Sequence, residues 1–300
     1  MTGEILRARR ALMYVPGSDE AKIKKASALD LDSAILDLED GVAFNQKDEA
    51  RGIIRRALET LDFSRTERMV RINPLYSGRA QEDLFAVLPG KPDAILIPKA
   101  DSPQIVREVD EIITEMEQEH GWDRGRIALA LLIESAAAFV NLAEICRSSA
   151  RIQALVFGAE DYCADAGVTR TVEATELLFV RSSLVLHAAA FGLQAIDMVQ
   201  INYRDTALLE WECRAAVELG FCGKTVVHPG QIDMVQRMFT PDEKLIAYAR
   251  RVVEGAREAQ LKGSGVFTLE GKLVDLPVVK RAENILARAR AAGVVEERSE

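Results

Sequence analysis

The sequence predicts a (β/α)₈ barrel with a C-terminal helix and β-hairpin appendage. Eight short apolar runs recur every few tens of residues, with amphipathic segments of helical period between them, and no G-x-G-x-x-G follows an early run. Continuous apolar runs are typical of strands buried on both faces of a parallel sheet. Eight strand and helix units over roughly 230 residues suit such a barrel. The alternative, an open doubly wound sheet, lacks its nucleotide-binding glycine motif here.

The eight predicted strands follow one another over the first 229 residues. They are ALMYVP (11–16), SAILDLE (33–39), RMVRIN (68–73), AILIPK (94–99), IALALLIE (127–134), IQALVFGAE (152–160), QAIDMVQ (194–200) and KTVVHP (224–229). Intervening segments such as 102–118 and 173–190 carry apolar residues at helical spacing. We therefore expect residues 1–240 to form the catalytic barrel domain.

Residues 241–300 are predicted to form a separate C-terminal lid segment. A helical pattern near 241–261 precedes GSGVFTLEGKLVDLPVV, in which apolar and polar residues alternate on both sides of Glu270-Gly271. This arrangement predicts a β-hairpin. Pro277 then fits the first turn of a final helix.

Composition indicates a globular protein that acts on small molecules. The chain is 48% apolar and carries 38 basic against 47 acidic residues, a net charge of −9, which argues against nucleic acid or a membrane as the main partner. No apolar run is long enough to span a membrane, and the first 17 residues lack an apolar signal core. The four cysteines lie far apart without a C-x-x-C pair, so we expect reduced thiols and a cytoplasmic protein.

The ends of the predicted strands carry the candidate site residues, because barrels of this kind build their sites at the carboxyl ends of the strands. These residues are Asp37, Glu39, Asp40, Arg71, Asn73, Lys99, Glu134, Glu160, Asp161 and His228. Carboxylates gathered on one rim repel one another unless a cation or a proton intervenes. Glu134 and Asp161, on adjacent strands, are placed to hold one Mg²⁺, and the absence of a histidine beside them favours a hard ion over zinc. The alternative for both is an acidic residue at a helix start.

Arg71 follows an apolar pair, and its guanidinium is expected to point into the barrel mouth. A buried arginine needs an anionic partner, which a substrate carboxylate or a developing enolate would supply. The alternative is a structural salt bridge to Asp37 or Glu39. Asp37, Glu39 and Asp40 are expected to support the site from behind the metal ligands, because acid-rich turns are common after such strands.

Lys99 and His228 each leave two interpretations open. A lysine at a strand end can form a Schiff base with a carbonyl substrate, but a rim rich in carboxylates favours a protonated, paired amine. His228 is the one histidine placed at a strand end. A plain hydrogen bond to a ligand and a catalytic role are both compatible with that position.

Several motifs, in order and at the expected spacings, resemble one enzyme family. They are YVPG with Asp19-Glu20, LDLEDGV, VRIN, LIPKA, LIES, VFGAEDY, FGLQAID and GKTVVHPGQI. Together they resemble the citrate lyase β-subunit-like family of the HpcH/HpaI aldolase superfamily, within it most of all the citramalyl-CoA lyases, over about residues 9–285.

This resemblance implies a Mg²⁺-dependent barrel enzyme, with Mn²⁺ as a possible substitute, that cleaves citramalyl-CoA to acetyl-CoA and pyruvate. The family's metal ligands fall on Glu134 and Asp161 and its substrate arginine on Arg71. Its catalytic aspartate falls on Asp275, in a segment that in relatives folds over a neighbouring subunit, so a homotrimer is implied. From the residues alone, Asp275 is also the natural N-cap of the helix that includes Pro277.

The resemblance also implies positions for the CoA thioester and the oxo acid. The family's CoA positions fall on Tyr14, Lys25, His228 and Pro229. A further lysine of close relatives corresponds to Ala21, for which Lys22 or Lys24 would compensate on the same helix.

Backbone N–H groups of Ala159, Glu160 and Asp161, expected in a loop after the sixth strand, are candidates to hold the substrate carboxylate. Glu160 is expected to shape that loop.

Four other functions remain open at this stage. They are a malyl-CoA lyase, a β-methylmalyl-CoA lyase, a citrate lyase β-subunit acting on a citryl-acyl-carrier-protein thioester, and a non-catalytic protein that binds CoA or an oxo acid. A cut after residue 262 is expected to leave a folded but inactive barrel.

Overall fold

The computed structural model describes residues 7–200 and 202–295. Within them the chain divides into two compact units, residues 9–236 and residues 237–295 together with 7–8. The ends of the predicted segments, residues 1–6 and 296–300, lie outside the described residues. In the described part no helix is both long and apolar enough to cross a membrane.

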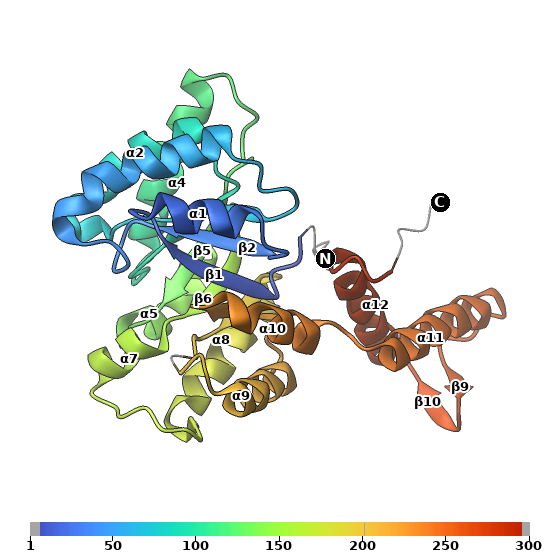
Figure 1. Cartoon of the computed structure of the whole chain (residues 1–300). Coiled ribbons are helices and arrows are strands. Elements are labelled where there is room, and N and C mark those ends of the chain that lie inside the picture. Colours follow the sequence, from blue (N-terminus) through green and yellow to red (C-terminus); the bar gives the residue numbers. More distant parts are fainter. Residues whose placement is uncertain (1–6, 201, 296–300) are drawn as a thin grey trace. The chain divides into compact units, whose positions relative to one another are not determined.

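The first unit is a closed barrel of eight parallel strands in sequence order, which confirms the predicted fold (Figure 1). The strands are β1 (Ala11–Pro16), β2 (Ser33–Asp37), β3 (Glu67–Arg71), β4 (Ala94–Ile97), β5 (Ala128–Ile133), β6 (Ile152–Phe157), β7 (Gln194–Asp197) and β8 (Gly223–Val226). The helices that follow them are α1 (Glu20–Ser27), α2 (Lys47–Thr60), α3 (Ala80–Val87), α4 (Pro103–Glu119), α5 (Ala136–Val140), α6 (Leu142–Cys146), α7 (Ala159–Ala166), α8 (Leu178–Phe191), α9 (Thr206–Leu219) and α10 (Ile232–Phe239).

Alternate residues of the strands fill the barrel interior. Leu12, Ile35, Met69, Leu96 and Ile196 belong to one buried cluster, with small alanines contributed by β5 and β6. Because side chains alternate along a strand, the residues between them face the surrounding helices. This packed interior fixes the strands, and so it fixes the side chains at their carboxyl ends.

Most strands end before the polar residues of the predicted runs. The sixth run was expected to continue to residue 160, but β6 ends at Phe157 and α7 begins at Ala159. The expectation of a loop there was therefore wrong. Gly158 takes the N-cap position, and two acidic residues in the first turn of α7 suit the positive end of the helix dipole.

The second unit contains the predicted helix, hairpin and final helix. They are α11 (Glu243–Leu261), an antiparallel pair of β9 (Phe267–Leu269) and β10 (Lys272–Val274), and α12 (Leu276–Ala291). Ala249 and Val252 of α11 share a small core with Val274 and with Ala282 of α12. A cut after residue 262 would expose this face of α11, so a point substitution tests the unit more cleanly.

Candidate active site

Arg71, the last residue of β3, is held by two carboxylates. It is 8% exposed. Its Nε and Nη2 atoms donate to Asp37 at 2.7 and 2.6 Å, and Nη1 lies 2.7 Å from Glu39 Oε2. Burial alone would lower the pKa of Arg71, but Asp37 and Glu39 hold that pKa well above its ordinary value. The guanidinium therefore remains charged, and the salt bridge left open by the sequence is present.

Asp37 is saturated by donors. Its Oδ1 also accepts the Glu39 N–H, and its Oδ2 accepts the Gly41 N–H, both at 2.8 Å. With the two bonds from Arg71, all of its ordinary acceptor positions are used. Asp37 is thus built to orient Arg71, and a role as metal ligand would require it to give up one of these bonds.

Two N–H donors of Arg71 remain for a ligand. A guanidinium has five, and within the described residues three of them meet Asp37 and Glu39. The guanidinium also lies over the Tyr14 ring, 4.7 Å from its centre. Tyr14 and the two carboxylates thus set one orientation of Arg71, with donors left for an oxyanion.

Glu134 and Asp161 lie close together, with the Lys99 ammonium between them. Glu134 is 2% exposed and accepts the Lys99 N–H at 2.8 Å. Lys99 Nζ contacts Asp161 Oδ1 and lies 3.7 Å from Glu134 Oε1. The structure therefore brings the two predicted metal ligands together around a positive charge.

Gly158 makes this arrangement possible. A Cβ atom at that position would lie only 2.6 Å from both Cβ and Oε2 of Glu134. Since non-bonded carbon atoms separate by about 3.5–4.0 Å, any side chain there would displace the carboxylate.

Burial disfavours the ionised form of the rim carboxylates. Burial raises the pKa of Glu134 to about 8, although Lys99 opposes the shift. Burial likewise raises the pKa of Glu39 to about 7, with Arg71 opposing. Burial by itself would lower the pKa of Lys99, but Asp161 and Glu134 raise it overall. A protonated, paired Lys99 is unsuited to attack a carbonyl, which favours the paired interpretation over the Schiff base.

The donor set fits Mg²⁺. Among the described residues, no three or more histidine, cysteine, aspartate or glutamate side chains gather to hold a metal. A magnesium ion is usually bound by one or two carboxylates and completed by water and substrate oxygens. Glu134 and Asp161 would supply the carboxylates, and the place now taken by the lysine charge shows that a cation is tolerated between them.

The start of α7 supplies backbone donors beside Asp161. Ala159, Glu160 and Asp161 are its first three residues, and the Tyr162 N–H is the first to donate within the helix, to the Gly158 carbonyl at 3.1 Å. The N–H groups of a first turn have no partner within their helix and attract anions. The Glu160 side chain has a different, structural contact. It pairs with Arg170, whose Nη2 donates to the Val199 carbonyl at 2.9 Å.

The predicted CoA positions lie on β1, α1 and the end of β8. Lys25 is exposed on α1, and Lys24 lies one turn from Ala21 on nearly the same face, whereas Lys22 pairs with Asp19 at 3.0 Å. Of the two candidates to replace the missing lysine, Lys24 has the better position.

His228 caps the 3-10 turn Pro229–Gln231. Its Nδ1 accepts the Gly230 N–H at 3.0 Å, so in the neutral ring the proton lies on Nε2. The ring stacks on Tyr203, with centroids 4.5 Å apart. His228 therefore presents a fixed donor atom, Nε2, to a ligand.

Asp275 belongs to the C-terminal unit. It is the N-cap of α12 and accepts the Val278 N–H at 3.3 Å. One carboxylate oxygen accepts the capping hydrogen bond, and the other oxygen takes no part in the cap. The cap proposed from sequence is therefore present, and it is compatible with a second role.

Residues 10–229 match the sequence pattern of HpcH/HpaI aldolase/citrate lyase. This chain belongs to that family. The match covers the barrel from β1 to the end of β8, and so it includes every rim residue described above.

Individual members of the family are similar over nearly the whole chain. The human mitochondrial citramalyl-CoA lyase is 38% identical over 94% of this chain and 85% of its own length. The citrate lyase subunit beta of Escherichia coli K12 is 37% identical over 97% of this chain and 96% of its own. A crystal structure of CitE from Mycobacterium tuberculosis with magnesium, acetoacetate and coenzyme A is 33% identical, with a TM-score of 0.75, covering 95% of this chain and 99% of that one.

Two contributors to the site were missed by sequence reasoning. Tyr203 follows β7 in a polar stretch without an apolar pattern, and only its stacking on His228 reveals it. Lys47 opens α2, where a lysine ordinarily indicates a solvated face, yet it is buried. Tyr203 meets His228 across 25 residues, and Lys47 meets Asn73 across 26 and the carbonyls of Leu38 and Glu39 across a turn, none of which local patterns show.

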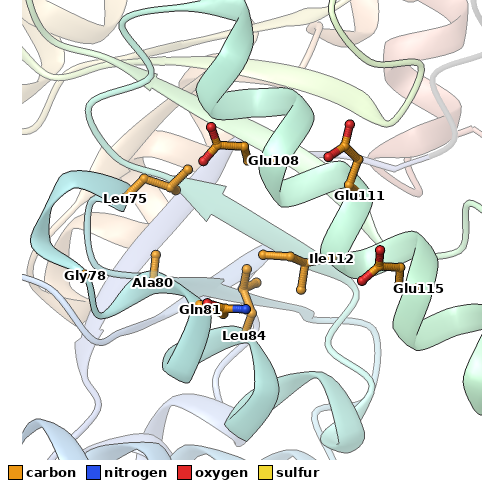
Figure 2. A pocket seen from close by; sticks show the side chains of 9 residues that line it. All are labelled: Leu75, Gly78, Ala80, Gln81, Leu84, Glu108, Glu111, Ile112 and Glu115. Atoms are coloured by element: carbon orange, nitrogen blue, oxygen red, sulfur yellow. The ribbon is translucent and has the colours of Figure 1, made fainter.

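A groove elsewhere on the barrel unit has no part in this site. It measures about 350 Å³ and lies between α3 and α4 (Figure 2). Its lining consists of Leu75, Gly78, Ala80, Gln81, Leu84, Glu108, Glu111, Ile112 and Glu115. None of the family's site positions is among these residues.

Proposed function

We propose that this chain is a Mg²⁺-dependent carbon–carbon lyase that cleaves citramalyl-CoA to acetyl-CoA and pyruvate. The observation that carries the proposal is the Glu134 and Asp161 pair around a positive charge on the same barrel rim as the oriented Arg71. Similarity to a citramalyl-CoA lyase over 94% of the chain supports the choice of substrate.

The residues divide the work of cleavage. Glu134 and Asp161 would hold Mg²⁺, which when bound supplies charge that binds the substrate carboxylate and hydroxyl and lowers the pKa of that hydroxyl. The first-turn N–H groups of α7 would hold the carboxylate of the oxo acid. The substrate hydroxyl would release its proton to water, and its oxygen would form the C=O bond of pyruvate as the C–C bond breaks. The electron pair of the C–C bond passes to the thioester to form an enolate, and the free donors of Arg71 would stabilise the enolate oxygen. Asp275 would then give a proton to the enolate carbon, which yields acetyl-CoA.

We place the CoA moiety against Tyr14, Lys25, His228 and Pro229, with Lys24 taking the part of the lysine absent at position 21. A protonated lysine is a good partner for phosphate. We further propose a homotrimer in which Asp275 reaches the rim of a neighbouring subunit.

The test is release of oxo acid from citramalyl-CoA and from malyl-CoA, side by side, with Mg²⁺ and with EDTA. We expect metal-dependent pyruvate release that exceeds glyoxylate release at least about tenfold in kcat/KM, since one methyl group is worth ~1–3 kcal/mol in a pocket. Mn²⁺ should substitute in part. A preference for malyl-CoA would identify the chain as a malyl-CoA lyase. Cleavage in the presence of EDTA would contradict the proposed dependence on a metal ion.

Metal affinity should depend on pH through Glu134. Its pKa in the metal-free protein is raised to about 8 from 4.5, so near neutral pH a proton must leave when the metal binds. We expect the Kd for Mg²⁺ to fall about tenfold per unit between about pH 6 and 8 and to level off above that range. Isothermal titration in buffers of different ionisation enthalpy would measure the proton released. A Kd that does not change with pH would contradict a neutral Glu134.

A citrate lyase β-subunit is the second candidate function, favoured by 37% identity to the Escherichia coli subunit with nearly full coverage of both chains. Such a subunit would act on a citryl thioester of an acyl-carrier protein and would use the same rim. Cleavage of that thioester, together with no cleavage of free citramalyl-CoA, would decide for it.

A further inference from the structure

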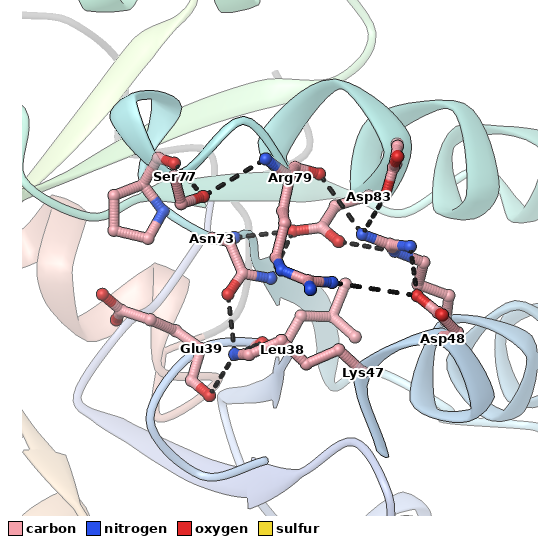
Figure 3. Close-up of polar contacts among 11 residues, drawn as sticks. Leu38, Glu39, Lys47, Asp48, Asn73, Ser77, Arg79 and Asp83 are labelled. Atoms are coloured by element: carbon pink, nitrogen blue, oxygen red, sulfur yellow. Dashed lines mark hydrogen bonds and ion pairs between the residues drawn. The ribbon is translucent and has the colours of Figure 1, made fainter. Parts of the chain in front are cut away.

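Lys47 is a buried lysine whose three N–H groups are all used. The residue is 9% exposed, and Nζ donates to the Leu38 carbonyl at 2.8 Å, to the Glu39 carbonyl at 2.9 Å and to Asn73 Oδ1 at 2.7 Å (Figure 3). An ammonium group has three donors and no acceptor. Lys47 is therefore saturated, which leaves it no capacity to act on a substrate as a base or a nucleophile.

The contacts of Lys47 lead directly to Arg71. Leu38 and Glu39 form the turn after β2, and the carboxylate of Glu39 lies 2.7 Å from Arg71 Nη1. Lys47 thus fixes the backbone of this turn, and the Glu39 side chain, which belongs to the same turn, contacts Arg71. Lys47 also brings the second positive charge to a group in which Arg71 faces two carboxylates, Asp37 and Glu39.

The Lys47 position is itself held firmly. Its third acceptor, Asn73, donates both its backbone N–H and its Nδ2 to Asp83 Oδ2 at 2.7 Å. Asp83 is fully buried on α3 and accepts from Arg51 Nε at 2.7 Å. A chain of charged hydrogen bonds therefore runs from the helices around the barrel to the turn that carries Glu39, and such bonds are about twice as strong as neutral ones.

We propose that Lys47 is a positioning residue for the proposed lyase reaction: it locks the Leu38–Glu39 turn so that Glu39 keeps Arg71 in the orientation that receives the enolate oxygen. This inference rests on the proposed function for its kinetic consequence, and on the contacts above for its structural one.

The test compares Lys47→Met with Arg151→Met in the full-length protein with Mg²⁺. Arg151 is a matched control, since it is 8% exposed and pairs with Asp110 and Glu117, but it precedes β6 at the opposite, amino end of the strands. We expect Lys47→Met to lower kcat for citramalyl-CoA about 10- to 100-fold with a small change in KM, because a misplaced group loses transition-state contacts first. Arg151→Met should lose stability in urea but keep kcat within about twofold.

A structural readout separates this inference from the proposed function. Crystal structures of both variants should show Glu39 displaced from Arg71 in Lys47→Met alone, whether or not the wild-type protein cleaves any thioester. An unchanged Glu39 and Arg71 pair in Lys47→Met, or equal losses of kcat in the two variants, would overturn the inference. If Lys47→Met does not fold, Lys47→Gln, which keeps two N–H donors without the charge, takes its place with the same expected directions.

Discussion

Replacing Asp161 by alanine is expected to lower kcat for citramalyl-CoA at least about 1,000-fold while leaving the fold intact. The side chain of Asp161 is 40% exposed, so its removal costs little packing. It supplies one of two proposed protein ligands, and metal stabilisation of the charge that develops in the transition state is worth several kcal/mol. At 1.36 kcal/mol per tenfold, a loss of about 4 kcal/mol gives this reduction. Rapid-mixing assays of pyruvate release, with titration of Mg²⁺ into the same sample, would measure both effects.

Asp165→Asn is the matched control for that change. Asp165 lies one turn later on α7, and its carboxylate accepts the Ala136 N–H at the start of α5 at 2.8 Å, so its hydrogen bond is to backbone and not to the Lys99 or Glu134 side chain. We expect the control to bind Mg²⁺ and to turn over like the wild type. Undiminished activity in Asp161→Ala would end the metal assignment.

The second large effect is expected from Asp275→Asn. General acid catalysis typically contributes about 100- to 10,000-fold, and we expect a loss of kcat in this range because an amide cannot protonate the enolate carbon. The free energy of unfolding should hardly change, since asparagine caps a helix as well as aspartate does. Asp275→Ala should lose the same activity and, in addition, about 1 kcal/mol of stability through the missing cap. Urea unfolding and steady-state kinetics on the two variants separate the two roles of Asp275.

Asp242→Asn is a control within the same unit. Asp242 caps α11 by accepting the Leu245 N–H at 2.7 Å, so the two aspartates have the same local structure. Only the change at 275 should affect kcat. Full activity in Asp275→Asn would remove the proposed acid from the mechanism.

Mixed assemblies test where Asp275 acts. A trimer that combines Asp161→Ala and Asp275→Asn subunits contains some sites with both wild-type groups only if the acid comes from a neighbouring subunit. Random mixing would then restore about one quarter of the wild-type activity. No activity in the mixture would place the acid in its own subunit or exclude it.

The sequence was sufficient to predict the barrel because the strands are buried apolar runs and most of the runs end in polar residues. It also placed Glu134, Asp161 and Arg71 at one rim, since the carboxyl ends of parallel strands meet there. The pairing of Arg71 with Asp37 and Glu39 was left as an alternative, because a buried guanidinium accepts a protein carboxylate or a ligand carboxylate equally well.

Other features depend on distances that the order of residues does not encode. The boundary between β6 and α7 was misplaced by a few residues. Gly-Ala-Glu-Asp follows the apolar run directly, and the glycine is the only residue in it that signals the end of a strand. Lys47 resembles any lysine at a helix start, and its burial depends on acceptors from two other loops.

Gly158 shows that the proposed metal ligand Glu134 depends on the residues that follow two neighbouring strands, β5 and β6. Glu134 occupies the volume that a methyl group on residue 158 would fill. The carboxylate therefore fits only because residue 158 has no side chain. In evolution, substitutions at the two positions are expected to be coupled, because a larger residue at 158 requires a shorter one at 134. A search for variants with altered metal preference should therefore vary 134 and 158 together, because libraries that vary either position alone sample mostly sites that cannot form.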